Sequence, residues 1–576
     1  MFARPRRPWV KGAFRQALVT AAVLAALSCA PASSPPLAES ESGSSARQVG
    51  TPRGKLTIAW AREPDNLSPN FGGSAGGGEF RWVFNSFLTY RDMQGLPHPM
   101  IARQIPTRDN GDWVINPDGT MVTVYRLREN ARWHDGTPLT AQDFAFAYTV
   151  YMDPLVAVHD REQERWMSRV ESLDDHAVRV VWSEPYIFAN TLGGLPPLPR
   201  HRLEDKYRAN PATFNSGEEW TSAYVGTGPF RVERWEAGSM LLARAHLEWF
   251  LGPPRIDSVE IRFIGDPSAL LANLLAGEVD YTSSPAIRGT EAVVARDRWA
   301  TRGEGYLKTW AKRLKFLEFQ YRDVPNWQRA VTDPRIRQAF LHAIDRQGLA
   351  DAMTDGLSQS ADAWVLPSEA IFSDVDRAIT KYPFDPRRAT SILQEAGWRT
   401  QPAGLLADAA GQTLDVEVNS GSSEPHIATI VADNWRGLGI NANVYVLPVA
   451  RQNDREFRAS FPATHVGERT ITFQGLHLVS SLIPTRETSF REPNRGGFSD
   501  PEVDRLHNLF VTSVDEPVRR NAAVAINKRL SEIPAYGPLY YHVDVLLAKT
   551  RVKGPLGEFG DQTGVTWNIF EWEIAD

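Results

Sequence analysis

The sequence predicts an α/β protein built from two or three subdomains. The chain has 576 residues, which is far more than one ordinary hydrophobic core accommodates. Hydrophobic residues make up 42% and charged residues 23%, which are ordinary values for a folded protein. Segments that favour strands are followed by segments that favour helices, and the clearest example lies at residues 122–148.

This segment is typical of a strand, a tight turn and the start of a helix. Apolar residues that favour strands roughly alternate with polar neighbours at its beginning. Asp135-Gly136 supplies the turn, and Thr140 is a good helix N-cap. His134 beside Asp135 has the composition of a catalytic dyad, but no nucleophile stands near it in the sequence. We therefore favour the turn and keep the dyad as the alternative.

The first 28 residues have the pattern of a secretory signal peptide. A basic head without acidic residues precedes an apolar stretch at 17–27 that is short for crossing a bilayer. Arg6-Arg7 resembles part of a twin-arginine export signal, although a plain basic head is the favoured interpretation. Cys29, the only cysteine of the chain, follows directly, and the sequence from Ala26 to Cys29 resembles a bacterial lipobox. We expect lipid attachment at Cys29, and an unmodified thiol is the alternative.

Residues 29–54 are predicted to form a flexible tether. They are rich in Pro, Ser, Ala and Gly, so they bury too little apolar surface to fold. The net charge of −6, with no Lys/Arg stripe in the body of the chain, argues against nucleic acid as a partner.

A glycine-rich loop at 70–78 follows the first predicted strand, at 55–60. It contains Gly-Gly-Ser-Ala-Gly at 72–76, which matches the nucleophile-elbow pattern of hydrolases with Ser74 as the nucleophile. That elbow needs a strand directly before the serine, and residues 69–71 do not form one. A secreted serine hydrolase using Ser74 is therefore the alternative function, and a protein without catalytic activity is the favoured one.

Four helices are predicted to begin with the same Asp-Pro pair. The aspartate side chain accepts hydrogen bonds from free backbone amides, and proline fits the first helical position. The four aspartates are Asp266, Asp333, Asp385 and Asp500. The second helix carries an apolar stripe that we assign to the core. Its members are Ile336, Ala339, Phe340, Ala343 and Ile344.

Many segments resemble the family 5 extracellular solute-binding proteins, which are the oligopeptide, dipeptide and nickel binders of ABC importers. The most informative are Asn116–Thr120, Tyr125–Arg128, Trp133–Asp143 and the Gly-Thr-Gly-Pro sequence at 226–229. Further segments in the family's order lie at 275–280, 335–346, 384–398, 498–504 and 519–541. The corner that ends the hairpin after 229 departs from the family pattern, since it reads Ala245-His-Leu-Glu-Trp-Phe250.

The resemblance implies a two-lobed periplasmic-binding-protein-like fold. It is the large three-subdomain variant of type II, with a hinge and a ligand cleft between the lobes. Residues 55–306 and 528–576 would form a large lobe of two subdomains, and residues 307–527 the smaller lobe. The implied protein is a monomer without cofactor that lies outside the cytoplasm, anchored through Cys29. It would pass a peptide-like or other small solute to an ABC permease and its ATPase subunits.

The resemblance also indicates ligand contacts on both lobes. The loop after the first strand lines the cleft in the family, which points to Phe71, Gly72 and Gly73. The segment that corresponds to a Trp-plus-Asp sequence of peptide binders supplies Phe473, Gln474, Gly475, Leu476, His477 and, close behind, Arg486. No acid stands in this segment to neutralise a peptide's α-ammonium group, which favours a neutral or anionic ligand. Glu487 or Asp454 could serve from another direction.

For several other residues and for the function, the sequence allows alternative interpretations. His477 is either a ligand contact or an ordinary loop histidine, and Trp364 and Trp435 are expected in the core rather than against a ligand. The 12 histidines are scattered without a close helical pair, so direct binding of nickel is not expected. A solute receptor that signals without uptake would have the same fold.

Overall fold

The computed structural model describes residues 52–71, 77–93, 95–158, 163–192, 195–422, 425–471, 476–557 and 564–575. The predictions of a signal peptide, a tether and a lipid site at Cys29 lie outside these residues. So do Gly72, Gly73, Ser74 and the segment 473–475.

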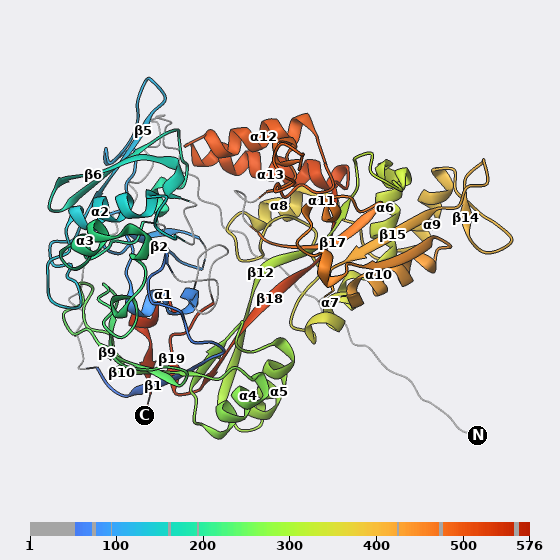
Figure 1. Cartoon of the computed structure of the whole chain (residues 1–576). Coiled ribbons are helices and arrows are strands. Elements are labelled where there is room, and N and C mark those ends of the chain that lie inside the picture. The colour runs from blue at the N-terminus through green and yellow to red at the C-terminus, as the bar shows by residue number, and fades with distance from the viewer. Residues whose placement is uncertain are drawn as a thin grey trace, which may run out of the picture. The chain divides into compact units, whose positions relative to one another are not determined.

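The largest sheet in the described part of the chain has ten strands in the order β16-β15-β17-β12-β18-β11-β1-β10-β9-β8 (Figure 1). Their bounds are Asn441–Val446, Asp415–Ser420, Thr464–Thr470, Gly305–Phe319, Tyr536–Lys549, Tyr281–Ser283, Lys55–Trp60, Ser258–Phe263, Met240–Ala245 and Phe230–Glu236. A second sheet has the order β4-β5-β7-β6, with strands Trp113–Ile115, Met121–Arg126, Ala177–Trp182 and Met167–Asp174. Strand β1 has the bounds that the sequence predicts.

Strands β12 and β18 run side by side (Figure 1). Their side chains belong to separate hydrophobic cores at the two ends of the pair. They pair antiparallel from Gly305 opposite Lys549 to Glu318 opposite Tyr536. At one end, Trp310 and Leu546 belong to the same core as β1. Towards the other end, side chains of the same two strands pack into cores with residues of segment 331–535. The register shifts between Ala311 and Arg313, close to where the cores divide.

We call the part built on the β1 core the first lobe and the part built on segment 331–535 the second lobe. First-lobe helices are α1 Gly77–Phe84, α2 Ala141–Met152, α3 Arg200–Ala209, α4 Pro267–Ala276 and α5 Gly289–Ala300. Second-lobe helices are α6 Pro334–Ala343, α7 Arg346–Thr354, α8 Phe372–Ala378, α9 Pro386–Glu395, α10 Pro425–Arg436, α11 Arg455–Arg458, α12 Pro501–Thr512 and α13 Glu516–Glu532. The domain bounds at 306/307 and 527/528 stay a prediction.

Short strand pairs complete the two lobes. The first lobe has the hairpin β2 Thr89–Arg91 with β3 Pro97–Pro99, and the pair β19 Val552–Lys553 with β20 Glu573–Ile574. The second lobe has the pair β13 Arg399–Thr400 with β14 Leu406–Ala407. Among the described helices, none has both the length and the apolar character needed to cross a membrane.

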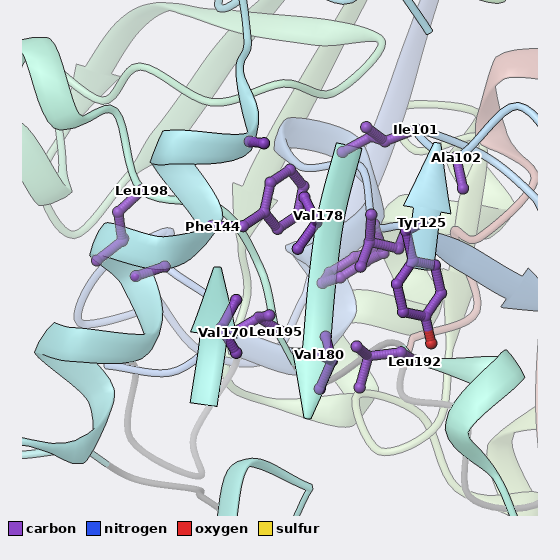
Figure 2. Close-up of a cluster of buried hydrophobic side chains, with 14 of the residues drawn as sticks. Ile101, Ala102, Tyr125, Phe144, Val170, Val178, Val180, Leu192, Leu195 and Leu198 are labelled. Carbon is purple, nitrogen blue, oxygen red and sulfur yellow. The ribbon is translucent and has the colours of Figure 1, made fainter. Parts of the chain in front are cut away.

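The predicted strand, turn and helix at 122–148 form β5, the Asp135-Gly136 turn and α2. Gly136 has a φ of +86°, which favours glycine. Side chains of α2, β5 and β7 gather in one apolar cluster, in which Phe144 lies beside Val178 (Figure 2). At the helix start, the Thr140 N–H donates to the Asp143 carboxylate at 2.8 Å, which confirms the predicted cap.

The glycines at 226 and 228 are required because the backbone of α1 comes very close. A Cβ atom at Gly226 would stand 2.0 Å from the Phe84 carbonyl oxygen, and one at Gly228 would stand 2.3 Å from the Phe84 carbonyl carbon. His134 joins this contact, because its Nδ1 accepts the Gly226 N–H and its Nε2 donates to the Gly228 carbonyl, each at 3.1 Å. Two segments that carry the family resemblance therefore pack against each other.

All four predicted Asp-Pro helix starts are confirmed, at the beginnings of α4, α6, α9 and α12. In each, the aspartate side chain accepts a backbone N–H of the first turn. The apolar stripe of α6 is at most 2% exposed, as expected for core residues. Helix α13 begins in a related way, with Asp515 as N-cap and Pro517 in its first turn, and this start is not among the four predicted ones.

Candidate functional site

A cavity of about 810 Å³ lies between the two lobes. Its first-lobe wall consists of the β2–β3 hairpin, the loop at 107–109, Trp113 and the segment 187–191. Its second-lobe wall consists of residues 369–371, Ile471 at the end of β17, and the junction of α12 with α13. This volume falls within the range of small-molecule sites, which is roughly 300–1,000 Å³.

The first-lobe wall is shaped by the turn between β2 and β3. The Asp92 carboxylate accepts the N–H of Leu96 at 3.0 Å, which closes the hairpin and presents Leu96 at its tip with 55% of its surface exposed. Behind the hairpin, the Arg91 guanidinium lies 5.9 Å from the centre of the Phe188 ring. A ligand at this wall would meet apolar surface next to a cation.

The second-lobe wall is formed by the start of α13. The Arg519 guanidinium donates to the Ser513 carbonyl at 3.1 Å, and burial lowers the pKa of Arg519. The neighbouring Arg520 donates to the Asp374 carboxylate at 2.8 Å, so its charge is compensated. Four arginines and four acidic residues line the cavity as a whole: Arg91, Arg108, Arg519, Arg520, Asp109, Glu369, Asp515 and Glu516. The charges of the side chains that line this cavity therefore balance, and its lining alone does not select the sign of a ligand's charge.

Two apolar side chains beside the cavity each pack against the core of the opposite lobe. Ile187 of the first lobe is 4% exposed and belongs to the second-lobe core that contains Leu314 and Phe316. In the opposite direction, Val514 of the second lobe packs against the first-lobe core around Phe144. The lobes therefore meet through apolar contacts beside the cavity.

A charged network occupies the place where β12 and β18 pass between the cores. Glu468 of β17 lies 2.5 Å from the Lys315 ammonium and 2.9 Å from the Arg313 guanidinium. Arg313 also lies 3.1 Å from Asp544 of β18. Burial raises the pKa of Glu468, but the two cations outweigh burial and hold that pKa below its usual value. The network links strands β12, β17 and β18 at the level where the first-lobe and second-lobe cores divide.

The described residues among the predicted ligand contacts lie outside this cavity's lining. Phe71 is 6% exposed and packs edge-on against Trp220, with ring centres 4.9 Å apart. Leu476 and His477 are completely buried, and Arg486 is exposed. Among the described residues, neither ring nitrogen of His477 has a hydrogen-bond partner, and burial holds its pKa well below the usual value. The remaining predicted contacts, Gly72, Gly73 and Phe473–Gly475, belong to the parts that are not described.

The alternatives considered for other residues are decided by burial and hydrogen bonding. Trp364 and Trp435 are 0% exposed, which confirms them as core residues. His134 uses both ring nitrogens on backbone groups, and burial lowers its pKa to about 3. Asp135 instead contacts His201 Nε2 at 2.8 Å, so the turn interpretation of His134-Asp135 is confirmed. Within the described ranges, no group of three or more His, Cys, Asp or Glu side chains is placed to hold a metal ion.

Comparison with known proteins decides the family. The family model described as bacterial extracellular solute-binding proteins, family 5, middle region, matches residues 110–470. The chain belongs to this family. The matched region includes the second sheet, the start of the second lobe and both strands β15 and β17.

Several curated relatives and solved structures are similar to this family 5 protein. A provisionally named ABC transporter peptide-binding protein of Brucella ovis is 26% identical over 350 residues, which cover 58% of this chain and 59% of the relative. The periplasmic oligopeptide-binding protein OppA of Salmonella typhimurium is 23% identical over 500 residues, 82% of this chain and 84% of the relative. The structure of the Bacillus subtilis oligopeptide-binding protein AppA with a nonapeptide has a TM-score of 0.62 at 20% identity, covering 91% of this chain and 99% of that one. The predicted two-lobed α/β fold is confirmed.

Sequence reasoning missed the walls of the cavity in this family 5 protein. The hairpin at 91–97 lies in no segment that carries the family resemblance. The segment at 519–541 carries the resemblance and includes most of α13, but it does not show that the start of α13 faces the first lobe. One local signal was available, since Asp515 and Pro517 form an N-cap of the same kind as the four that were predicted. That signal would have located the helix, although not its position beside the first lobe.

Proposed function

We propose that this family 5 protein captures a peptide-like or other small solute between its lobes, outside the cytoplasm, and delivers it to an ABC permease with ATPase subunits. The observation that carries the proposal is the cavity of about 810 Å³ with one wall from each lobe. A site divided in this way is completed when the lobes approach each other, so binding and closure are coupled. The names of the peptide-binding relatives support a peptide-like solute.

The proposal includes no catalytic step. His134 is held by backbone groups at both ring nitrogens, and its pKa of about 3 keeps it neutral at physiological pH. Ser74, the nucleophile of the alternative hydrolase, lies outside the described residues. Loss of measurable ester or peptide hydrolysis in a Ser74→Ala variant would overturn this part of the proposal.

The decisive experiment identifies the solute and follows its uptake. We would purify the protein without unfolding, identify the co-purifying molecule by mass spectrometry, and titrate that molecule calorimetrically. Cells lacking the gene should then lose most uptake of it, and the restored gene should return uptake. Tight binding with unchanged uptake would instead indicate a receptor. We expect unmodified dipeptides to bind weakly, because the segment from Ile471 to His477 carries no acid for their ammonium group.

The proposed ligand contacts rest on the family resemblance, and the position of the cavity bears on one of them. Phe71, Gly72 and Gly73 on one lobe, and Phe473–His477 with Arg486 on the other, are proposed from the family resemblance alone. Ile471, which lines the cavity, lies two positions before Phe473 in the sequence.

Lipid attachment at Cys29 is proposed as the membrane anchor. Replacing Cys29 by alanine removes the only thiol of the chain, so no acyl-modified cysteine can form. We expect the Cys29→Ala protein to move from the membrane fraction to the soluble fraction after cell fractionation. Retention of the variant in the membrane fraction would show that another segment holds it there.

A further inference from the structure

A second pocket, of about 140 Å³, lies in the second lobe and is lined mainly by arginines. They come from α11, the end of β17 and the loop before α12, and are Arg455, Arg458, Arg469, Arg491 and Arg495. The acidic residue in its lining is Glu492. The pocket thus places a large excess of positive charge around a small space.

No carboxylate of the described residues comes within ion-pair distance of these five guanidinium groups. Arginines just outside the lining behave differently, since Arg451 lies 2.8 Å from Asp454 and Arg505 lies 2.7 Å from Glu502. In the described part of the chain, the side chains of Arg458 and Arg495 also have no hydrogen-bond partner. Arg469 differs, because it donates to the Pro493 carbonyl at 3.0 Å.

The buried groups around the pocket show the effect of this charge. Burial lowers the pKa of Arg458 and Arg469, and the charge of Arg495 lowers both further. The pKa of His465, behind the pocket, falls to about 3 through burial and then through the same arginines. Glu318 attracts Arg458 and Arg469, but its carboxylate accepts the Gly496 N–H at 2.9 Å and lies buried. The chain therefore leaves the pocket strongly positive.

Guanidinium groups match oxyanions in shape as well as charge, since each can donate two parallel hydrogen bonds to a carboxylate or phosphate. The pocket is smaller than the roughly 300 Å³ at which sites for whole small molecules begin. It therefore suits one charged group of a larger solute. Arg469 stands two residues before Ile471, which lines the interlobe cavity, so both sites meet the end of β17.

We propose that the arginine pocket binds a multiply charged oxyanion group, of phosphate or polycarboxylate type, on the captured solute. The inference rests on the proposed function, because it takes the bound oxyanion group to be part of the solute carried between the lobes. It narrows the substrate class to anionic solutes.

The test measures anion binding to the purified protein by calorimetric titration at constant ionic strength. The probes are inorganic phosphate, O-phosphoserine and citrate, each compared with chloride. We expect O-phosphoserine or citrate to bind, and the double variant Arg458→Gln/Arg495→Gln to bind at least about a hundredfold more weakly, as loss of two charge-assisted hydrogen bonds predicts. The control Arg505→Gln, which removes an arginine with an acidic partner outside the pocket, should bind like the parent protein.

A melting curve without ligand separates binding from folding. Because the two arginines repel each other and have no ion-pair partner among the described residues, the double variant should melt at the parent temperature or higher. A clear drop in melting temperature would show a structural role for the pair and overturn the proposal. Arg469 is left unchanged because its bond to Pro493 is structural.

Other results of the anion titration would also overturn the proposal. Binding no stronger than that of chloride, or equal binding by the double variant, would overturn the proposal. Binding of inorganic phosphate alone would show a free-ion site and overturn the link to the solute. Because uptake is measured separately, intact uptake with no anion binding refutes only this inference, whereas anion binding without any uptake refutes only the proposed function.

Discussion

Several histidines of the described residues are buried where they cannot easily hold a proton, among them His134, His465 and His477. His134, His465 and His477 are 8%, 6% and 0% exposed. Burial lowers the pKa of each, to about 3 for His134 and His465, and the pocket arginines lower that of His465 and His477 further. An unfolded histidine has a pKa of about 6.5, so the unfolded chain takes up protons that the folded chain refuses.

These histidines predict a loss of stability in mild acid. Between their folded and unfolded pKa values the unfolded state binds more protons, so the free energy of unfolding falls as the pH falls below about 6.5. Each of His134 and His465 should cost roughly 2 kcal/mol between pH 7 and pH 5. Urea unfolding at several pH values measures this. His465→Gln should flatten the dependence, and the exposed His426→Gln should not; equal slopes in all three proteins would contradict the assignment.

A second prediction at this scale concerns the glycine at 226. An alanine there would place its Cβ against the Phe84 backbone, which cannot move as a side chain can. We expect Gly226→Ala to lower the free energy of unfolding by about 1–3 kcal/mol or more. Gly265→Ala is the matched control, because the nearest atom to its Cβ would be 3.4 Å away. Equal stability of the two variants, measured by urea unfolding, would show that α1 shifts freely.

Single residues also show where prediction from the sequence ends. The turn at Asp135-Gly136 was predictable because its cause lies within a few residues. The burial of Phe71 and His477 was not, because it depends on which distant side chains cover them, such as Trp220 and Trp364. The clustering of the five arginines was equally hidden, since they are spread over 41 positions from 455 to 495.

At the scale of helices, the Asp-Pro starts show how one side chain serves two purposes. Asp500 accepts the N–H groups of Glu502 and Val503 at 3.0 and 3.1 Å, and it also lies 2.8 Å from the Arg529 guanidinium of α13. The cap fixes where α12 begins, and the ion pair fixes how α12 lies against α13. The sequence predicts the first role from local spacing, whereas the second depends on how the two helices pack.

Substitution at Asp500 should separate these roles. Asp500→Asn keeps an acceptor for the cap and loses the charge, which should cost less than about 1 kcal/mol because Arg529 is partly exposed. Asp500→Ala also removes the cap, which should add about 1 kcal/mol. Urea unfolding of both variants measures the difference. Equal losses would mean that the cap contributes little to α12.

At the scale of the molecule, the lobes share the strands that join them. Strands β12 and β18 carry side chains of the first-lobe core and of two second-lobe cores, and their pairing is continuous across the division except for two register shifts. The family resemblance predicted two lobes and a hinge. Near residues 311–313, strand β12 passes from the first-lobe core to the second-lobe cores. This point has no local sequence signal of its own, because the strand continues through it.

Shared strands predict cooperative unfolding. Unfolding one lobe alone would leave half of β12 and β18 without a core, so we expect both lobes to unfold together. Scanning calorimetry should show one transition, coincident with the loss of circular dichroism and of tryptophan fluorescence. A variant with a cavity in one core, Leu314→Ala, should shift that single transition to lower temperature. Two separated peaks would show that the lobes unfold independently.

The apolar crossing contacts beside the cavity also bear on the heat capacity of solute binding. Ile187 can separate from Leu314 and Phe316 only by exposing apolar surface to water. Opening of the lobes therefore raises the heat capacity, and capture of a solute that draws them together lowers it. For this protein the temperature dependence of the binding enthalpy reports lobe movement even for a solute that is itself entirely polar.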